Sequence, residues 1–354
     1  MPAKQKMAVS LRSLMSSVLG GDGGKRTAAA RDELFAKTDP AADGDDCLRD
    51  CESCSVRYPR GFKIDEKDVL YGQVKGWSTH VLVGTGKTDW ARDVADEKGS
   101  VMEAIGKADG PTNGRLMVSA SNMATPSGTS DYSEPTTVLL LPAFTVVQNV
   151  DPRNVGILIR EIVDKSPTNE SPLVPLQQPS LLLPASLPGA DPGAPVLGTK
   201  ACPHSAVILM CSQRTRDARC GQSAPLLRKE LERHLRPLDL YRDMHDERPG
   251  GVAIYFISHV GGHKYSANVM VYRRPNAFGQ DDDVSGDACG PPPDGRADSD
   301  DLPDVGAAQC IWLARVRPED CENLVRYTVL KGKVVKPERQ LRGGFDRVKG
   351  LTSW

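Results

Sequence analysis

The sequence predicts an α/β protein composed of two similar halves. Short apolar runs bounded by turn residues, typical of buried strands, alternate along the chain with amphipathic helix patterns. The order strand, helix, three strands and closing helix occurs twice, on either side of a proline-rich stretch at 164–200. The length of 354 residues fits this division, because a domain averages roughly 150 residues.

The second half gives the clearer pattern. Its first strand is the apolar run SAVILMC, and a helix is expected directly after it at 223–235. Ser223 can cap that helix, Pro225 suits its first turn, and leucines four residues apart form an apolar stripe. The remaining elements of this half are strands at 252–258, 267–272 and 311–316 and a closing helix at 317–330.

The first half repeats this order with different residues. Its expected strands are 79–86, 115–121, 137–141 and 144–150, and its expected helices are 91–108 and 151–163. Because a helix connects the first two strands of each half, these two strands are expected to run parallel. The order of elements is compatible with a thioredoxin-like sandwich in each half.

The expected domain bounds follow from composition. The linker at 164–200 holds eight of the 27 prolines, a density that excludes helix and central strand. The expected segments are a disordered tail at 1–44, an N-terminal thioredoxin-like domain at 45–163, that linker, a second domain at 201–335 and a C-terminal tail at 336–354. An acidic stretch rich in Gly and Pro, 276–308, is expected to be a long disordered loop inside the second domain.

Charge and cysteine content limit the possible partners and the compartment. Lys plus Arg is 45 and Asp plus Glu is 46, so no basic excess indicates nucleic acid or an anionic membrane. No apolar run approaches the ~20 residues of a membrane-spanning helix, and no secretory apolar region follows Met1. Nine cysteines, an odd number, suit metal ligands, redox groups or packing residues in a reducing compartment. A cytoplasmic location is expected, with mitochondria as the alternative because the first residues are basic and lack acids.

Four residues of the second half carry the candidate chemistry. Cys211 and Cys220 follow the first strand in a C-x8-C spacing, and His259 and His263 follow the next strand in an H-x3-H spacing. Because loops at one edge of a parallel sheet lie side by side, these four side chains are expected to converge. Two thiolates and two imidazoles suit zinc or an iron–sulfur cluster. The first half has no cysteine or histidine at the corresponding loops.

Spacing alone leaves rival interpretations open. Two adjacent glycines between the histidines disfavour a helical H-x3-H pair and favour a tight loop. Cys202 and His204 look like the first part of a Rieske motif, but Ser223 stands where its second histidine is needed. A structural Cys2His2 zinc site is the sharper rival, although its cysteines are usually only about two to four residues apart.

The motifs CPHSAVILMCSQRTRDARCG, APLLRKELERHL, HVGGHKYSANVMVY and IWLARVRPED resemble those of a known family. It is the sucrase/ferredoxin-like, or actin-patches-distal, family of thioredoxin-like ferredoxins, and the resemblance covers about residues 45–350 apart from the linker and the acidic loop. It implies that the second domain is a thioredoxin-like ferredoxin with a 2Fe–2S cluster. The implied ligands are Cys211, Cys220, His259 and His263.

The expected function is therefore electron transfer or redox sensing, in cellular redox or oxidative-stress homeostasis, by a non-enzymatic carrier with an unidentified redox partner. Two neutral imidazoles in place of thiolates make reduction easier; bis-His Rieske clusters lie at about −150 to +300 mV, against about −400 mV for all-Cys plant-type clusters. The alternative is a zinc-stabilised interaction module without redox activity. No paired carboxylates support a glycosidase despite the word sucrase.

Two further features have no role in that cluster. Cys47, Cys51 and Cys54 stand in a C-x3-C-x2-C spacing, for which a zinc site or redox thiols are possible and plain thiols are the default. The last residue, Trp354, is expected to be exposed on a basic tail. It resembles a C-terminal signal by which cytosolic iron–sulfur proteins dock on their assembly machinery.

Overall fold

A computed structural model gives the structure of the chain and describes residues 28–175, 191, 193–281 and 304–354. The first 27 residues, residues 176–190 and 192 of the proline-rich linker and residues 282–303 of the acidic loop lie outside this part. The expectations of disorder for these segments therefore stay predictions.

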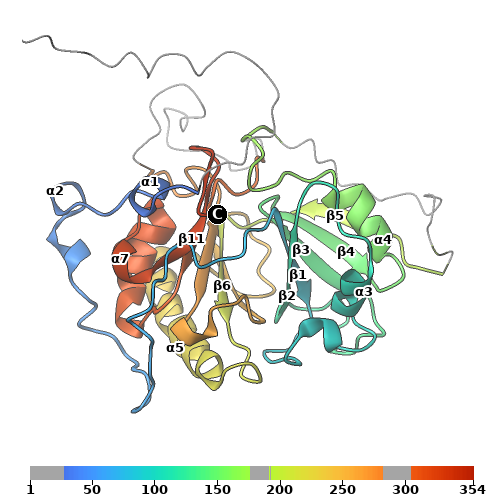
Figure 1. Cartoon of the computed structure of the whole chain (residues 1–354), viewed down its shortest axis with the longest axis horizontal. Coiled ribbons are helices and arrows are strands. Elements are labelled where there is room, and N and C mark those ends of the chain that lie inside the picture. Colours follow the sequence, from blue (N-terminus) through green and yellow to red (C-terminus); the bar gives the residue numbers. More distant parts are fainter. Residues whose placement is uncertain (1–27, 176–190, 192, 282–303) are drawn as a thin grey trace, which may run out of the picture.

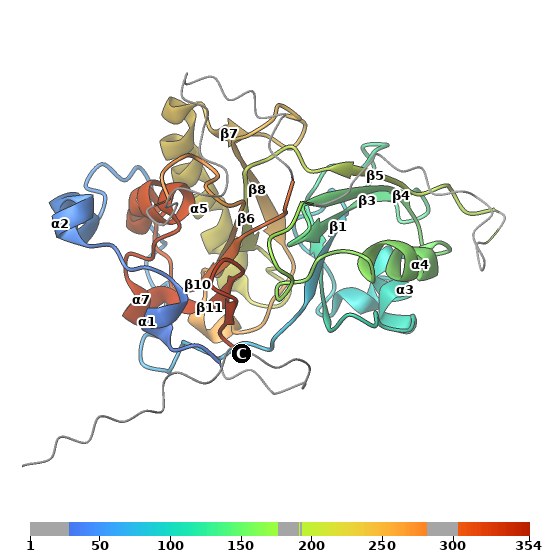
Figure 2. The ribbon, with the colours of Figure 1, turned by 90° about the horizontal axis from the view of Figure 1, so that it is seen from above.

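The described strands form one twelve-stranded sheet that runs through both halves (Figures 1 and 2). Its order is β12-β11-β10-β9-β6-β8-β2-β1-β3-β4-β5, and β7 pairs with β8 at one side. The strands are β1 (Thr79–Gly84), β2 (Leu116–Ser121), β3 (Thr136–Leu141), β4 (Thr145–Val150), β5 (Gly198–Ala201), β6 (Ala206–Cys211), β7 (Tyr241–Arg242), β8 (Val252–Ile257), β9 (Val269–Arg273), β10 (Gln309–Leu313), β11 (Leu341–Asp346) and β12 (Leu351–Thr352). The chain is thus a mixed α/β protein, as the sequence predicted.

The same pairing order recurs in the two halves. β1 pairs parallel with β2 and antiparallel with β3, and β6 pairs parallel with β8 and antiparallel with β9. The predicted parallel pairing of the first two strands in each half is confirmed. The halves meet where β2 and β8 run antiparallel at Ser121 and Ile257. Asn122 extends this seam, because its N–H donates to the Phe256 carbonyl and its side-chain oxygen accepts from the Phe256 N–H.

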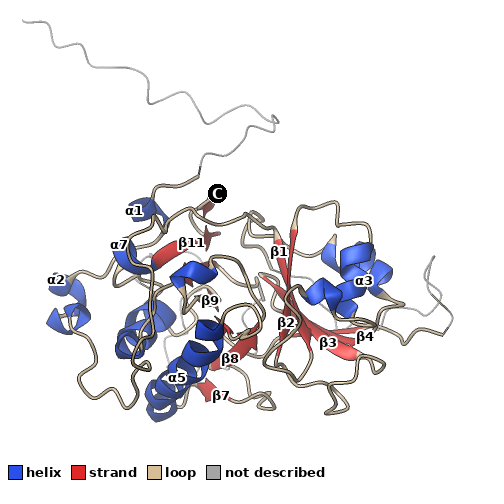
Figure 3. Ribbon diagram, turned by 60° about the horizontal axis from the view of Figure 1, so that its bottom comes forward, coloured by secondary structure: helices blue, strands red, loops and turns tan. Residues whose placement is uncertain are grey.

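The longest helix of the described residues is α5 (Ala218–Leu235), which lies beside β7 and β8 in Figure 3. Its buried leucines pack in the same core as residues of β6 and β8. It begins five residues before the predicted start. Asp217, not Ser223, is its cap: the Asp217 carboxylate accepts from the Arg219 N–H at 2.9 Å. Ser223 lies inside the helix, buried, with its hydroxyl directed at the Cys220 carbonyl.

The other helices are short. The stretch predicted as a helix at 91–108 contains η2 (Val94–Asp96) and α3 (Val101–Lys107), separated by Gly99 at φ +74°. The closing helices of the two halves both turn π-helical: α4 (Val155–Ile157) continues into η3 (Leu158–Val163), and η6 (Pro318–Asp320) and α6 (Cys321–Asn323) continue into η7 (Leu324–Val329). No helix within the described ranges is long and apolar enough to cross a membrane.

The N-terminal segment packs on the second half of the chain, not the first. It contains α1 (Arg31–Leu34), α2 (Pro40–Asp43) and η1 (Asp45–Leu48), which lie beside α7 (Pro337–Gln340) and away from β1–β4 in Figures 1 and 3. The Ala29 N–H donates to the Thr352 carbonyl, and the Val334 N–H donates to the Ala36 carbonyl. Leu34 is fully buried in the core of that half.

The segment expected as a C-terminal tail contains α7, the strand β11 and the edge strand β12. The expectation of an exposed Trp354 is wrong. Its ring is partly buried and lies 4.3 Å from the ring of Trp77, over Gly76. The buried Ser353 fixes this end, because its N–H donates to the Gly344 carbonyl at 3.0 Å.

Candidate metal centre

Cys211 and His259 come together at the ends of two parallel strands. Cys211 is the last residue of β6, its register partner on β8 is Ile257, and His259 follows two residues later. The apolar residues of both strands are buried, which fixes their position in the sheet. The Cys211 Sγ lies 4.0 Å from the His259 Nδ1.

Cys220 reaches the same place from the first turn of α5. The Asp217 cap sets where this turn begins, and the Cys220 N–H donates to the Asp217 carbonyl. The Cys220 thiol donates to Cys211, and both cysteines are almost fully buried. Of the four predicted residues, Cys211 therefore lies next to both Cys220 and His259. For His263 the structure gives the backbone, at the start of η5 (His263–Tyr265), and not the side chain.

The arrangement stabilises one thiolate. The Cys220 hydrogen bond and then the His259 ring lower the pKa of Cys211 to about 6, against the opposing effect of burial. The pKa of Cys220 is raised because its proton is shared with Cys211 and because it is buried. A thiolate is the form of cysteine that binds metals.

The loop between the histidines needs its glycines. Gly261 and Gly262 have φ of +84° and +64°, a left-handed conformation that favours glycine. A Cβ on Gly262 would lie 2.5 Å from the Cζ of Arg342. The sequence predicted a tight loop here, which is confirmed, but it gave no indication that an arginine from β11 fills it.

Arg342 is a buried cation beside this loop. Its Nη1 donates to the Gly261 carbonyl (2.8 Å) and to the Asn268 side-chain oxygen (2.9 Å), and its guanidinium lies 4.2 Å from the Trp312 ring. No carboxylate pairs with it among the residues the structure describes. Burial lowers its pKa to about 10, and the Cys211 thiolate acts in the opposite direction. Its positive charge therefore faces the site without neutralisation by an acid.

Two amides hold the loops that carry the candidate ligands. The Gln213 side-chain oxygen accepts from the His259 N–H at 2.8 Å, and its nitrogen donates to the Ala91 carbonyl. Asn268 accepts from both Arg342 and Trp312. Sequence reasoning missed these residues, since an isolated amide or arginine carries no spacing signal.

The first half of the chain supports the loop that carries the cysteines. Its loop after β1, which corresponds to the cysteine loop, packs against that loop. The Ser212 hydroxyl donates to the Thr88 carbonyl at 2.7 Å, and Asp89 accepts from both the N–H and the hydroxyl of Thr215. The half without candidate ligands therefore fixes the conformation of the loop that carries them.

Cys202 and His204, the alternative ligands, lie before β6 and thus at the opposite end of that strand from Cys211. Burial raises the pKa of Cys202 to about 11 and lowers that of His204 to about 4. They do not join the group at the other end.

The fold and the site together define a class of protein. It is a mixed α/β protein with two buried thiols and an imidazole at the ends of two parallel strands. The chain belongs to the sucrase/ferredoxin-like family, whose pattern matches residues 70–343. It is 28% identical over 343 residues to actin patches distal protein 1 of Saccharomyces cerevisiae, covering 90% of this chain and 92% of that protein.

Two further relatives match over a shorter stretch. The chain is 29% identical over 133 residues to altered inheritance of mitochondria protein 32 of Clavispora lusitaniae, and 26% identical over 130 residues to its counterpart in Debaryomyces hansenii. These matches cover 38% and 37% of this chain and 33% of each relative. No solved structure matches the chain.

Proposed function

We propose that the chain is a one-electron carrier that binds a 2Fe–2S cluster through Cys211, Cys220, His259 and His263. The observation that carries the proposal is the meeting of two buried thiols and an imidazole at the ends of β6 and β8. The proposal includes the fold of each half: both halves would be thioredoxin-like domains, and the second would be a thioredoxin-like ferredoxin.

The donor set fits such a cluster. Sulfur and imidazole ligands suit iron–sulfur clusters and zinc, whereas carboxylates are typical ligands of harder ions. Gly261 and Gly262 lack side chains, so the backbone of the loop can approach a bound group closely.

The chain's own residues would hold and tune this group. A bound 2Fe–2S cluster would supply a site that accepts and releases one electron. Gln213 and Asn268 orient the two ligand loops, and the loop of the first half supports them. The buried positive charge of Arg342 favours the reduced, more negative state.

The location and the partners belong to the same proposal. A reducing compartment, the cytosol, suits eight described cysteines that are all free, with mitochondria as the alternative that the names of two relatives suggest. The proposal also includes two partners. One is a redox partner of unknown identity, and the other is the cytosolic iron–sulfur assembly machinery, which would dock at Trp354. Docking would require Trp354 to leave its contact with Trp77.

The test is anaerobic purification of the full chain with analysis of iron, acid-labile sulfide and zinc, followed by EPR of the dithionite-reduced protein. We expect visible absorbance, two irons per chain and an axial or rhombic spectrum of a reduced 2Fe–2S centre. Cys211→Ser and His259→Ala should lose the cluster, and Cys202→Ser, a buried cysteine at the other strand end, should keep it. A colourless protein with one zinc bound at these residues would establish the zinc-stabilised module instead.

A further inference from the structure

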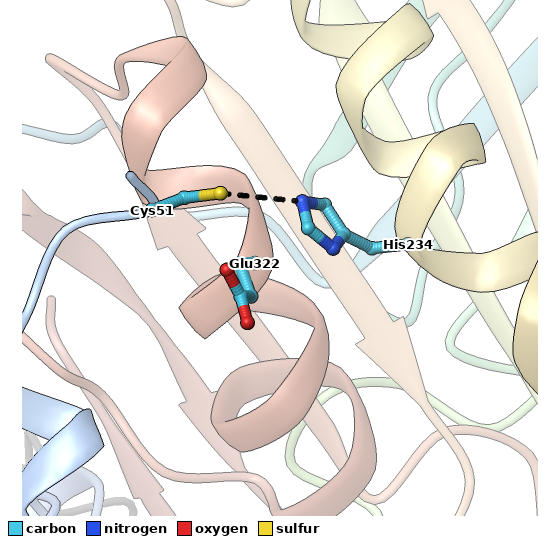
Figure 4. A group of neighbouring side chains, drawn as sticks. All are labelled: Cys51, His234 and Glu322. Atoms are coloured by element: carbon cyan, nitrogen blue, oxygen red, sulfur yellow. Dashed lines mark hydrogen bonds between the residues drawn. The ribbon is translucent and has the colours of Figure 1, made fainter. Parts of the chain in front are cut away.

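A second group of ligand-type side chains lies outside the candidate metal centre. Cys51 follows η1, His234 lies in the last turn of α5, and Glu322 lies in α6 (Figure 4). One ligand atom from each lies within 4.8 Å of the other two. Cys220 and His234 are fourteen residues apart on α5, so the two groups lie about 21 Å apart along the helix at ~1.5 Å per residue.

The distances match a small divalent ion. The Cys51 Sγ lies 3.9 Å from the His234 Nε2. Two tetrahedral ligands at zinc bond lengths, about 2.3 Å for sulfur and 2.0–2.1 Å for nitrogen, lie about 3.5 Å from each other. Small side-chain movements would therefore bring the Cys51 sulfur and the His234 nitrogen to the separation that a shared zinc ion requires. In Figure 4 the Cys51 and His234 side chains face each other, and the Glu322 carboxylate lies beside them.

The backbone around the group is already fixed. The Cys51 N–H donates to the Glu319 carbonyl at 3.0 Å, and the Asn323 side-chain nitrogen donates to the Arg49 carbonyl at 2.7 Å. Cys51 is only 8% exposed.

A positive group already occupies the centre. The Arg233 Nη2 lies 3.4 Å from the Cys51 Sγ and 3.0 Å from the His234 Nε2, while its Nε donates to the buried Glu230. The Arg233 side chain is 34% exposed, so its Nη2 end can move toward solvent and keep the Glu230 pair. Arg326, 3.6 Å from Glu322, is also partly exposed. The site thus attracts cations, and an arginine competes for it.

We propose that Cys51, His234 and Glu322 form a zinc site that fastens the N-terminal segment to α5 and α6. Thiolate, imidazole and carboxylate are the three ligand types that zinc takes in proteins, and water completes such three-residue sites. The inference does not depend on the proposed electron-transfer function, since none of the three residues belongs to the candidate metal centre.

The test is a Zn²⁺ titration of the metal-free full chain against a chromogenic chelator. To remove binding at the other group, the titration is done in a Cys211→Ser/Cys220→Ser background. We expect one equivalent of zinc there, and affinity lowered more than about a hundredfold by Cys51→Ser, His234→Gln or Glu322→Gln, beyond the 10–100-fold typical of residues that only support a ligand. Cys54→Ser and Glu319→Gln, neighbours outside the group, should bind as the background does.

Two further measurements keep the proposal falsifiable. Arg233→Gln should tighten zinc binding by removing the competing cation. Zinc should slow tryptic cleavage at the exposed Arg49 and Arg57 in the wild-type chain but not in Cys51→Ser. If the double-serine background does not fold, the difference in zinc stoichiometry between wild type and Cys51→Ser decides. Equal stoichiometry and equal protection in these two chains would overturn the proposal.

Discussion

Replacing Gly262 by alanine tests how the loop between His259 and His263 packs against Arg342. The new Cβ would lie 2.5 Å from the guanidinium carbon and 2.6 and 2.7 Å from its two terminal nitrogens. The guanidinium would have to move, at the expense of its hydrogen bonds to the Gly261 carbonyl and Asn268. An alanine at left-handed φ costs about 1–2 kcal/mol, and each buried hydrogen bond of a charged group about 1.5–3 kcal/mol. Together with the loss of one of these two hydrogen bonds, the strain should lower the free energy of unfolding by about 2.5–5 kcal/mol.

Gly279 supplies the matched control. Its φ is +67°, nearly that of Gly262, but no atom lies within 4 Å of the place of a Cβ. Gly279→Ala should therefore cost only the backbone strain, about 1–2 kcal/mol. Urea unfolding of the metal-free chains measures both values. In an Arg342→Met background the excess cost of Gly262→Ala should disappear. Equal losses for the two alanine variants in the wild-type background would refute the reasoning.

Three other residues give separate predictions. Complete burial lowers the pKa of His80 from 6.5 to about 3, so the unfolded chain takes up the proton first and stability falls as pH drops below 6.5, by about 2 kcal/mol at pH 5. Urea unfolding at pH 7 and pH 5 should show a smaller fall for His80→Gln, and an equal fall would contradict the assignment. If the proposed cluster is present, Arg342→Met should lower its reduction potential, because a buried positive charge beside Gly261 is lost. For one electron, a unit charge at a distance on the order of 10 Å and an effective dielectric constant of about 20 shifts a potential by about 70 mV. A spectroscopic redox titration measures the shift, with Arg342→Lys as the control that retains the charge. An unchanged potential would exclude that role. Trp354→Ala should cost about 1–2 kcal/mol in urea unfolding through its lost contact with Trp77. Iron content in cells is a separate readout, and no change in it would reject docking of the assembly machinery at this residue.

The sequence predicted what local pattern determines. Continuous apolar runs marked the buried strands, and the helix between the first two strands of each half implied parallel pairing. Parallel pairing places the ends of β6 and β8 side by side, so the proximity of Cys211 and His259 could be predicted without coordinates.

What the sequence did not reveal depends on contacts between distant residues. Arg342 lies 81 residues from Gly261, and Cys51 lies 183 residues from His234. The start of α5 was missed for a local reason. Gly221 and Pro225 interrupt the helical pattern, and Ser223 is itself a good cap residue. Tertiary packing of the buried Cys220 and Leu227 outweighs these preferences.

The association of the N-terminal segment with β11 and β12 has a consequence for biosynthesis. Residues near Ala29 and Ala36 leave the ribosome long before Val334 and Thr352, their hydrogen-bond partners, have been made. Arg342 is likewise translated 81 residues after Gly261, whose carbonyl it binds. The nascent chain must therefore hold its first segment without these partners until Val334 and Thr352 have been made.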